Sequence, residues 1–161
     1  PLGEMLLART VNGLAGIWFA GQKDHPGQLD APETADDPLL CQTVAELEAY
    51  FKGQSTDFTA RLDLHGTPFQ RAVWQALLDI HSGQTSSYAS IARSVGAPKA
   101  VRAVGGAIGK NPISVIVPCH RVIGSSGELT GYAGGLDRKR ALLRLEGVAQ
   151  RQATAHAALI E

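Results

Sequence analysis

The stretch that most restricts the fold of this chain is the run Ile-Ser-Val-Ile-Val at 113–117, which ends at Pro118. Its β-branched residues favour extended structure, and its length is that of a buried strand rather than a helix. Pro118 ends such a strand, because proline has no N–H to donate and restricts the residue before it. We therefore expect Cys119 to lie where regular structure ends, in apolar surroundings. A lone cysteine is more often a packing residue than a reactive one, so its neighbours must decide between the two.

The composition is that of an ordinary globular protein, with 19% charged and 44% hydrophobic residues and no apolar run of membrane-spanning length. The cysteines, Cys41 and Cys119, and the five histidines form no C-x-x-C or H-x-x-x-H spacing. We therefore expect no metal site and a reduced, cytoplasmic protein without a membrane partner. Residues 1–70 carry 4 Lys and Arg against 10 Asp and Glu, whereas residues 71–161 carry 11 against 5. This asymmetry indicates an anionic partner for the second part.

Residues 1–66 carry the pattern of a small antiparallel sheet. Asn12-Gly13 lies between two hydrophobic runs. This predicts a hairpin with a type I′ turn, in which both turn positions need positive φ. Alternating apolar and polar residues at 58–64 predict a further, half-buried strand.

A helix is predicted between these strands, after a polar loop at 22–38. Asp37-Pro38 supplies a cap and a first-turn proline, and Gly53 ends the apolar periodicity. Cys41 falls on this helix and is expected in the core. Together these elements predict an α/β N-terminal domain without chemistry of its own.

Residues 67–150 are predicted to form a mostly helical second domain, followed by an Ala-rich tail at 151–161 of no evident function. Thr67 and the following proline have capping-box spacing and start one helix. Trp74 on this helix is expected to be a packing residue.

Two short helices follow that resemble a helix-turn-helix. Ser87 caps the first, Gly96 ends it, and Ala97-Pro98 starts the second. A helix pair with such a tight turn is typical of DNA-binding proteins, although αα-corners without DNA contact share the pattern.

The second of these helices, residues 98–110, has an unusual surface. All its charged residues are basic, and each of its glycines weakens it by up to about 1 kcal/mol relative to alanine. Small residues allow close approach of a partner, and the helix lacks the several Asn, Gln or Arg side chains that read bases. The pattern favours sequence-independent DNA binding, with close packing against protein as the alternative. The residues concerned are Lys99, Arg102, Lys110, Gly105, Gly106 and Gly109.

The last predicted helix, residues 136–146, carries an acid in an unfavourable place. Glu146 lies in the last turn, where the helix dipole repels a carboxylate by about 0.3–1 kcal/mol, and it shares the apolar face. Buried acids are rare unless paired. The pattern therefore predicts a basic partner, an Arg, a Lys or a histidine, and His120 is the candidate of most interest. Gly147 then ends the helix.

Several motifs together resemble the O6-alkylguanine-DNA alkyltransferases, the methylated-DNA–protein-cysteine methyltransferases. Pro118-Cys119-His120-Arg121 is short on its own, but its order and spacing relative to the other motifs make the set specific. The resemblance covers most of residues 67–147 and is looser over the first part. It implies an α/β, ribonuclease-H-like N-terminal domain and a mostly helical domain with a helix-turn-helix. The other matching segments are Asn111-Pro112, 102–106, 132–135 and 145–147.

By this resemblance Cys119 accepts the alkyl group in an in-line displacement at the carbon on guanine O6. An ordinary thiol is only a few per cent ionised near pH 7, so it needs a base. The resemblance implies a Cys–water–His–Glu relay through His120 and Glu146. It also implies that Asn111 orients the thiol, and that Tyr88 turns the backbone phosphate and donates a proton to the departing guanine.

The resemblance further implies how DNA is held. The damaged base flips out of the duplex, which is easiest for a badly paired base, and Arg102 fills the gap while the helix lies in the minor groove. The partner is then double-stranded DNA containing O6-alkylguanine, bound by a monomer that uses no cofactor and acts once. Arg121 is expected to be structural. DNA-binding residues are expected at Tyr88, Lys99, Arg102, Ala103 and Gly105, and pocket residues at Tyr132, Val122, Ser125, Ala133 and Lys139.

Three rival functions are weighed against this one. A non-catalytic lesion sensor of the same fold lacks the acceptor cysteine, so Cys119 argues against it. A cysteine hydrolase would need His120 as the base for its own neighbour, which adjacent residues rarely achieve. A transcription regulator would need more base-reading side chains than residues 98–110 offer. Acceptance of O4-alkylthymine depends on the width of the pocket.

Overall fold

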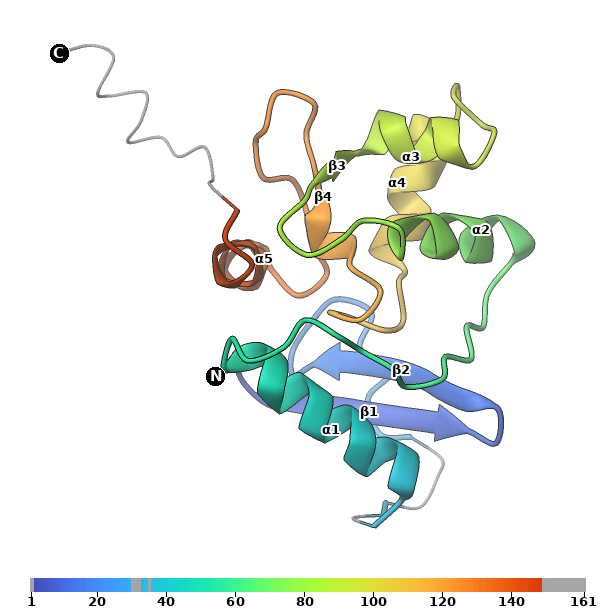
Figure 1. Cartoon of the computed structure of the whole chain (residues 1–161). Coiled ribbons are helices and arrows are strands. Elements are labelled where there is room, and N and C mark those ends of the chain that lie inside the picture. The colour runs from blue at the N-terminus through green and yellow to red at the C-terminus, as the bar shows by residue number, and fades with distance from the viewer. Residues whose placement is uncertain (1, 30–32, 35, 149–161) are drawn as a thin grey trace, which may run out of the picture.

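The N-terminal part of the molecule is built on a β-hairpin (Figure 1). The computed structural model describes residues 2–29, 33–34 and 36–148, so the predicted tail at 151–161 lies outside the described residues. β1 (Met5–Thr10) pairs antiparallel with β2 (Gly13–Phe19), which confirms the hairpin. Its predicted type I′ turn is wrong, because Asn12 has no positive φ; Gly13 has, at 155°, as the first residue of β2. A Cβ there would lie 2.6 Å from the carbonyl oxygen of Arg61, so the glycine also permits a close approach.

A bulge turns two residues of β2 toward the same edge. The register against β1 shifts by one residue in the hairpin, and such an extra residue changes which backbone groups face each side. The backbone N–H and C=O groups of Leu14 and Ile17, three positions apart, therefore both form hydrogen bonds on the edge of β2 opposite β1. Leu14 bonds to residues 61–63 at 2.7 and 2.8 Å. Ile17 accepts from the N–H of Ser114 at 3.1 Å and donates to the carbonyl oxygen of Pro112 at 2.8 Å.

The two further strands predicted from the sequence are wrong. Segment 58–64 forms a single bridge at Leu62, and segment 113–117 a single bridge at Ile113. Alternation and β-branched content indicate a fit to a sheet surface but do not supply a pairing partner. Burial is as expected, since every residue from 113 to 122 is buried.

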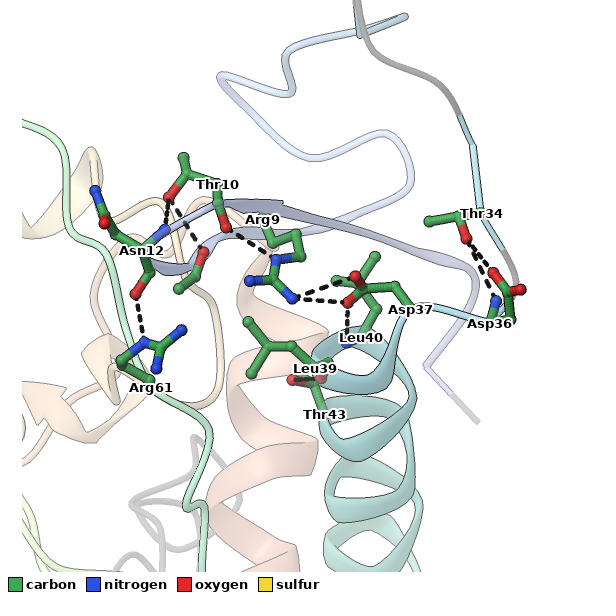
Figure 2. A network of polar contacts seen from close by, with 11 residues as sticks. Arg9, Thr10, Asn12, Thr34, Asp36, Asp37, Leu39, Leu40, Thr43 and Arg61 are labelled. Atoms are coloured by element: carbon green, nitrogen blue, oxygen red, sulfur yellow. Dashed lines mark hydrogen bonds and ion pairs between the residues drawn. The ribbon is translucent and has the colours of Figure 1, made fainter.

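Helix α1 (Pro38–Phe51) is anchored to the hairpin through its cap. Asp37 accepts a hydrogen bond from the Leu40 N–H at 2.9 Å, which confirms the predicted start. Arg9 of β1 donates to both carboxylate oxygens of Asp37, at 3.1 and 3.2 Å (Figure 2). The expectation that Cys41 lies in the core is wrong. Cys41 is exposed, because the buried face of α1 carries other residues.

The second part is mostly helical, as predicted. α2 (Pro68–Leu77) begins with the expected capping box, and Trp74 on it is 2% exposed, with its Nε1 donating to the Ala107 carbonyl at 2.8 Å. Trp74 is thus a packing residue. Within the described part of the chain, no helix has the length and apolar character needed to cross a membrane. The remaining elements are β3 (Ser86–Ser87), α3 (Tyr88–Ser94), α4 (Val101–Gly109), the 3-10 turn η1 (Cys119–Arg121), β4 (Val122–Ile123), which pairs in parallel with β3, and α5 (Leu136–Leu145).

A tight turn joins α3 to α4. Ser87 caps α3 as expected, and Gly96, with φ 75°, ends it with the paired hydrogen bonds of a Schellman motif. α4 begins at Val101 rather than at Pro98, because residues 97–100 close a turn of their own. Both helices pack on α2, on the side of the molecule away from the hairpin (Figure 1).

Candidate active site

Two successive backbone turns place Cys119. A 2.9 Å hydrogen bond within residues 114–116 closes the first around Val115, which has φ 72°. The N–H of Cys119 donates to the Val117 carbonyl at 2.8 Å and closes the second around Pro118, at φ −84° and ψ 63°. These three-residue turns take the place of the predicted strand. A positive φ at the buried, β-branched Val115 costs about 1–3 kcal/mol, a strain found mainly at functional sites.

Asn111 holds this segment in shape. Its Nδ2 donates to the Val117 carbonyl at 2.8 Å, and its Oδ1 accepts from the Ile113 N–H at 3.0 Å. The same side chain lies close to the thiol of Cys119. Burial raises the pKa of Cys119, while the Asn111 side chain and the charge of Lys139 act in the opposite direction.

Three side chains converge on the carboxylate of Glu146, which is 1% exposed. His120 places its Nε2 2.9 Å from Oε2, so the expected Glu146–His120 contact is present. Arg121 donates from Nε to Oε1 at 2.8 Å and from Nη2 to Oε2 at 2.9 Å. Tyr50 of α1 donates its hydroxyl to Oε2 at 2.5 Å. Arg121 therefore binds the carboxylate of Glu146, and it does not line the cavity described below.

The protonation states follow from these contacts. Burial opposes ionisation of Glu146, but the hydrogen bonds from His120, Arg121 and Tyr50 outweigh it and lower the pKa of Glu146 to about 2. Burial is the main cause of a lowered pKa at His120. An ionised carboxylate only accepts, so Nε2 of neutral His120 carries its proton and Nδ1 keeps a lone pair. Nδ1 is buried without a partner among the described residues, which leaves it able to take a proton.

Cys119 borders a cavity between the two parts of the chain. Of the residues predicted for the site, Tyr88, Gly105, Tyr132 and Ala133 line it with Cys119. Within the described residues, no group of three or more His, Cys, Asp or Glu could hold a metal ion. The full lining is Lys23, Asp24, Tyr88, Gly105, Gly106, Ile108, Gly109, Lys110, Cys119, Gly131, Tyr132 and Ala133.

Three other predicted pocket residues do not line this cavity. Lys139 is buried and donates from Nζ to the carbonyl oxygens of Val122, at 2.6 Å, and Thr130, at 3.1 Å. Burial lowers the pKa of Lys139 to about 8. The residue holds β4 against the loop that rims the cavity, and Ser125 lies exposed on that loop. Contact of these residues with a base stays a prediction.

Sequence reasoning missed the part of the cavity that comes from the N-terminal domain. The N–H of Lys23 donates to the Ala133 carbonyl at 3.0 Å, and Asp24 pairs with Lys110 at 3.2 Å. These residues belong to the polar loop at 22–38, which has no periodicity to mark a role. The positive φ of Asp24, 61°, is a feature of the folded chain alone.

Helix α4 presents an exposed face of mostly small residues beside the cavity, called the bare face below. Arg102, Ala103, Gly106 and Gly109 are exposed, as is Lys99 before the helix. A Cβ at Gly106 or Gly109 would meet nothing within 4 Å. Close packing within the described part of the chain therefore does not explain these glycines. A flat face with basic residues next to the cavity of Cys119 suits a polyanion.

Two family models match consecutive parts of the chain. The ribonuclease-like domain of 6-O-methylguanine DNA methyltransferase matches residues 1–64, and the DNA binding domain of the same family matches residues 68–148. A methylated-DNA–protein-cysteine methyltransferase of Mycobacterium bovis is 51% identical over 146 residues, or 91% of this chain and 87% of that protein. The chain belongs to this methyltransferase family.

Solved structures of the family agree with the fold. The O6-methylguanine methyltransferase of Mycobacterium tuberculosis has a TM-score of 0.82 at 47% identity, over 97% of this chain and 94% of that one. The Mycobacterium tuberculosis OGT in complex with DNA has a TM-score of 0.80 at 49% identity, over 88% and 85%. The predicted methyltransferase architecture, a small sheet-containing domain followed by a helical domain, is confirmed.

Proposed function

We propose that this member of the methyltransferase family repairs duplex DNA by moving the alkyl group of O6-alkylguanine onto its own Cys119. The observation that carries the proposal is the position of Cys119. It is a buried thiol at a cavity beside the bare face of α4, and it directly precedes His120, which is paired with Glu146. Membership of the family supports the same reaction.

The reaction is an in-line displacement. Sγ of Cys119 forms a bond to the alkyl carbon as the bond from that carbon to O6 breaks, and the electron pair stays on the guanine. The thiol proton passes through a water to Nδ1 of His120, and Glu146 stabilises the imidazolium at Nε2. Tyr88, whose hydroxyl lies 2.7 Å from Oγ1 of Thr130, supplies a proton to the departing guanine. The thioether has no leaving group that could restore the thiol, so each molecule acts once.

DNA approaches along α4. The exposed glycines let the helix enter the minor groove, and Arg102 occupies the gap left by the flipped base. Lys99, Ala103 and Gly105 lie on the same surface, and Tyr132 and Ala133 border the flipped base. The width of the cavity at Tyr132 and Ala133 also decides whether O4-alkylthymine is accepted.

Intact mass measurement after mixing with an excess of methylated duplex tests the proposal. The protein should gain one methyl group per molecule, and peptide mapping should place it on Cys119. Cys119→Ala should bind the duplex and gain no mass. Turnover beyond one equivalent, or methylation of Cys41 instead, would overturn the proposal.

We infer further that the protein acts as a monomer in the cytoplasm. The acceptor must stay a thiol, which requires a reducing compartment, and all groups of the relay come from one chain. Sedimentation with methylated duplex should give one protein per lesion.

A further inference from the structure

We propose that Tyr50 of the N-terminal domain is a positioning residue for alkyl transfer, because its hydroxyl holds the carboxylate of Glu146 toward His120. The inference rests on the proposed function and adds a residue to it. Its basis is the 2.5 Å bond from the Tyr50 hydroxyl to Oε2 of Glu146, the same oxygen that lies 2.9 Å from Nε2 of His120.

The ring of Tyr50 is fixed by its own domain. It is 2% exposed, and its centroid lies 5.4 Å from that of Phe51 and 5.5 Å from that of Phe58. Tyr50 lies in the last turn of α1, and Glu146 caps α5 in the other domain. The hydroxyl therefore gives the carboxylate a rigid reference point across the domain boundary.

The hydroxyl stays a donor throughout the working pH range. Burial, and next the negative charge of Glu146, raise the pKa of Tyr50 well above its ordinary value. The fork of Arg121 fixes the plane of the carboxylate by binding both oxygens. Tyr50 binds Oε2 alone, the oxygen that must point at His120.

The loss of this bond has a defined effect on protonation. The titratable and charged groups around the pair are Tyr50 on α1, Arg121 on η1 and Lys139 on α5. Glu146 stabilises the protonated form of His120 because its carboxylate lies against Nε2. Without the Tyr50 bond the carboxylate is held there less firmly, so the pKa of His120 falls further below its ordinary value. Neutral His120 is then present down to lower pH, but it is a weaker base for the thiol proton.

Tyr50→Phe tests the proposal, because it keeps the ring and removes only the hydroxyl. Single-turnover methyl transfer is measured against pH with methylated duplex in excess. The plateau rate should fall about tenfold, because His120 becomes a weaker base, and the pH of half-maximal rate should move down by about half a unit or more. DNA affinity should not change, since the hydroxyl is buried away from the face of α4.

Phe58→Leu is the matched control. It disturbs the aromatic contact with Tyr50 but leaves the hydroxyl in place, so it should lower the free energy of unfolding without moving the pH of half-maximal rate. Adding Tyr50→Phe to Glu146→Gln should bring no further change in the profile. A merely structural Tyr50 would give two variants that differ from the wild type in stability alone, and that result would overturn the proposal.

NMR titration of the His120 ring distinguishes failure of this inference from failure of the proposed function, because it needs no DNA. The pKa of His120 should be lower in Tyr50→Phe than in the wild type. An unchanged titration overturns the role of Tyr50. Absence of methyl transfer by the wild type overturns the proposed reaction instead.

Discussion

At the scale of single residues, burial acts on both partners of the proposed proton transfer. It raises the pKa of Cys119 and lowers that of His120, so thiol and imidazole are both held neutral. Moving the proton between them creates two charges in a place that disfavours charge. The ionised Glu146 offsets part of that cost, because it lies against the imidazolium as it forms.

Glu146→Gln should therefore slow alkyl transfer by roughly ten- to a hundredfold, the value of a lost hydrogen bond between charged groups. DNA affinity should hardly change, because the side chain of Glu146 is 1% exposed. Rates come from single-turnover assays, and affinities from the same substitution in a Cys119→Ala background, which does not react. Equal losses in rate and affinity would contradict the relay.

Acid should destabilise the fold through the same pair. The pKa of Glu146 is about 2 in the folded chain against an ordinary 4.5, so its contribution of roughly 3 kcal/mol is present above the ordinary value and is lost as pH falls toward 2. The lowered pKa of His120 acts in the same direction, because the unfolded chain takes up that proton first as pH falls below 6.5. Urea unfolding followed from neutral pH to about pH 2 should show a falling free energy of unfolding. In Glu146→Gln the free energy of unfolding should fall less steeply with pH. An identical decline would argue against the lowered pKa of Glu146.

Sequence could indicate some residues of this site and not others. Cys119, His120 and Glu146 could be predicted from the sequence, because a reactive motif and a buried acid near a helix end are local signals. The role of Tyr50 could not be predicted, because its hydrogen bond to Glu146 joins positions 96 residues apart. An aromatic residue on a helix predicts only packing. Asp24 likewise acquires its partner only when the two domains meet.

At the scale of elements, the exposed glycines of α4 lower its helix stability and leave part of its surface without bulky side chains. The caps around it at Thr67, Ser87 and Gly96 were predictable, because each depends on residues a few positions away. The strands expected at 58–64 and 113–117 failed, since a strand needs a partner that local sequence does not specify. The exposure of the glycines, on which the proposed role of α4 rests, also depended on the surrounding fold.

Substitutions at Gly106 test this surface. Gly106→Ala should raise the free energy of unfolding by up to about 1 kcal/mol, since alanine favours helix and its Cβ meets nothing. Gly106→Leu should fold equally well and bind DNA more weakly, because the longer side chain stands where the groove would lie. Thermal unfolding and DNA titration measure the two effects. Unchanged DNA binding by Gly106→Leu would place the DNA elsewhere.

Arg102→Ala should weaken repair of duplex DNA far more than reaction with free O6-alkylguanine base. In the proposed complex the exposed side chain acts only on the duplex from which the base has left, and Arg102 does not line the cavity of Cys119. Comparing the two substrates at equal lesion concentration gives the ratio. A similar loss on both would assign Arg102 a part in the chemistry.

At the scale of the whole molecule, the N-terminal domain supports the reactive segment rather than merely preceding it. β2 bonds to Ser114 and Pro112, and α1 sends Tyr50 to Glu146. The loop that contains Lys23 completes the wall of the cavity. The sequence predicted two domains. The bulge that places Leu14 and Ile17 on one edge of β2 could not be predicted, because no local sequence pattern indicates it.

The two domains should therefore unfold together. Trp18 lies on β2 and Trp74 on α2, so Trp18→Phe and Trp74→Phe each leave one fluorescent reporter in one domain. Denaturant transitions of the two variants should coincide with each other and with circular dichroism. Separate midpoints would mean that the contacts between the domains contribute little.

The bonds from β2 to residues 61–63 and 112–114 have a second consequence. An open strand edge is a template for pairing with another chain and hence for aggregation. Here the segment that leads to Cys119 also covers part of that edge. Changes that loosen this segment should therefore reduce solubility together with alkyl transfer.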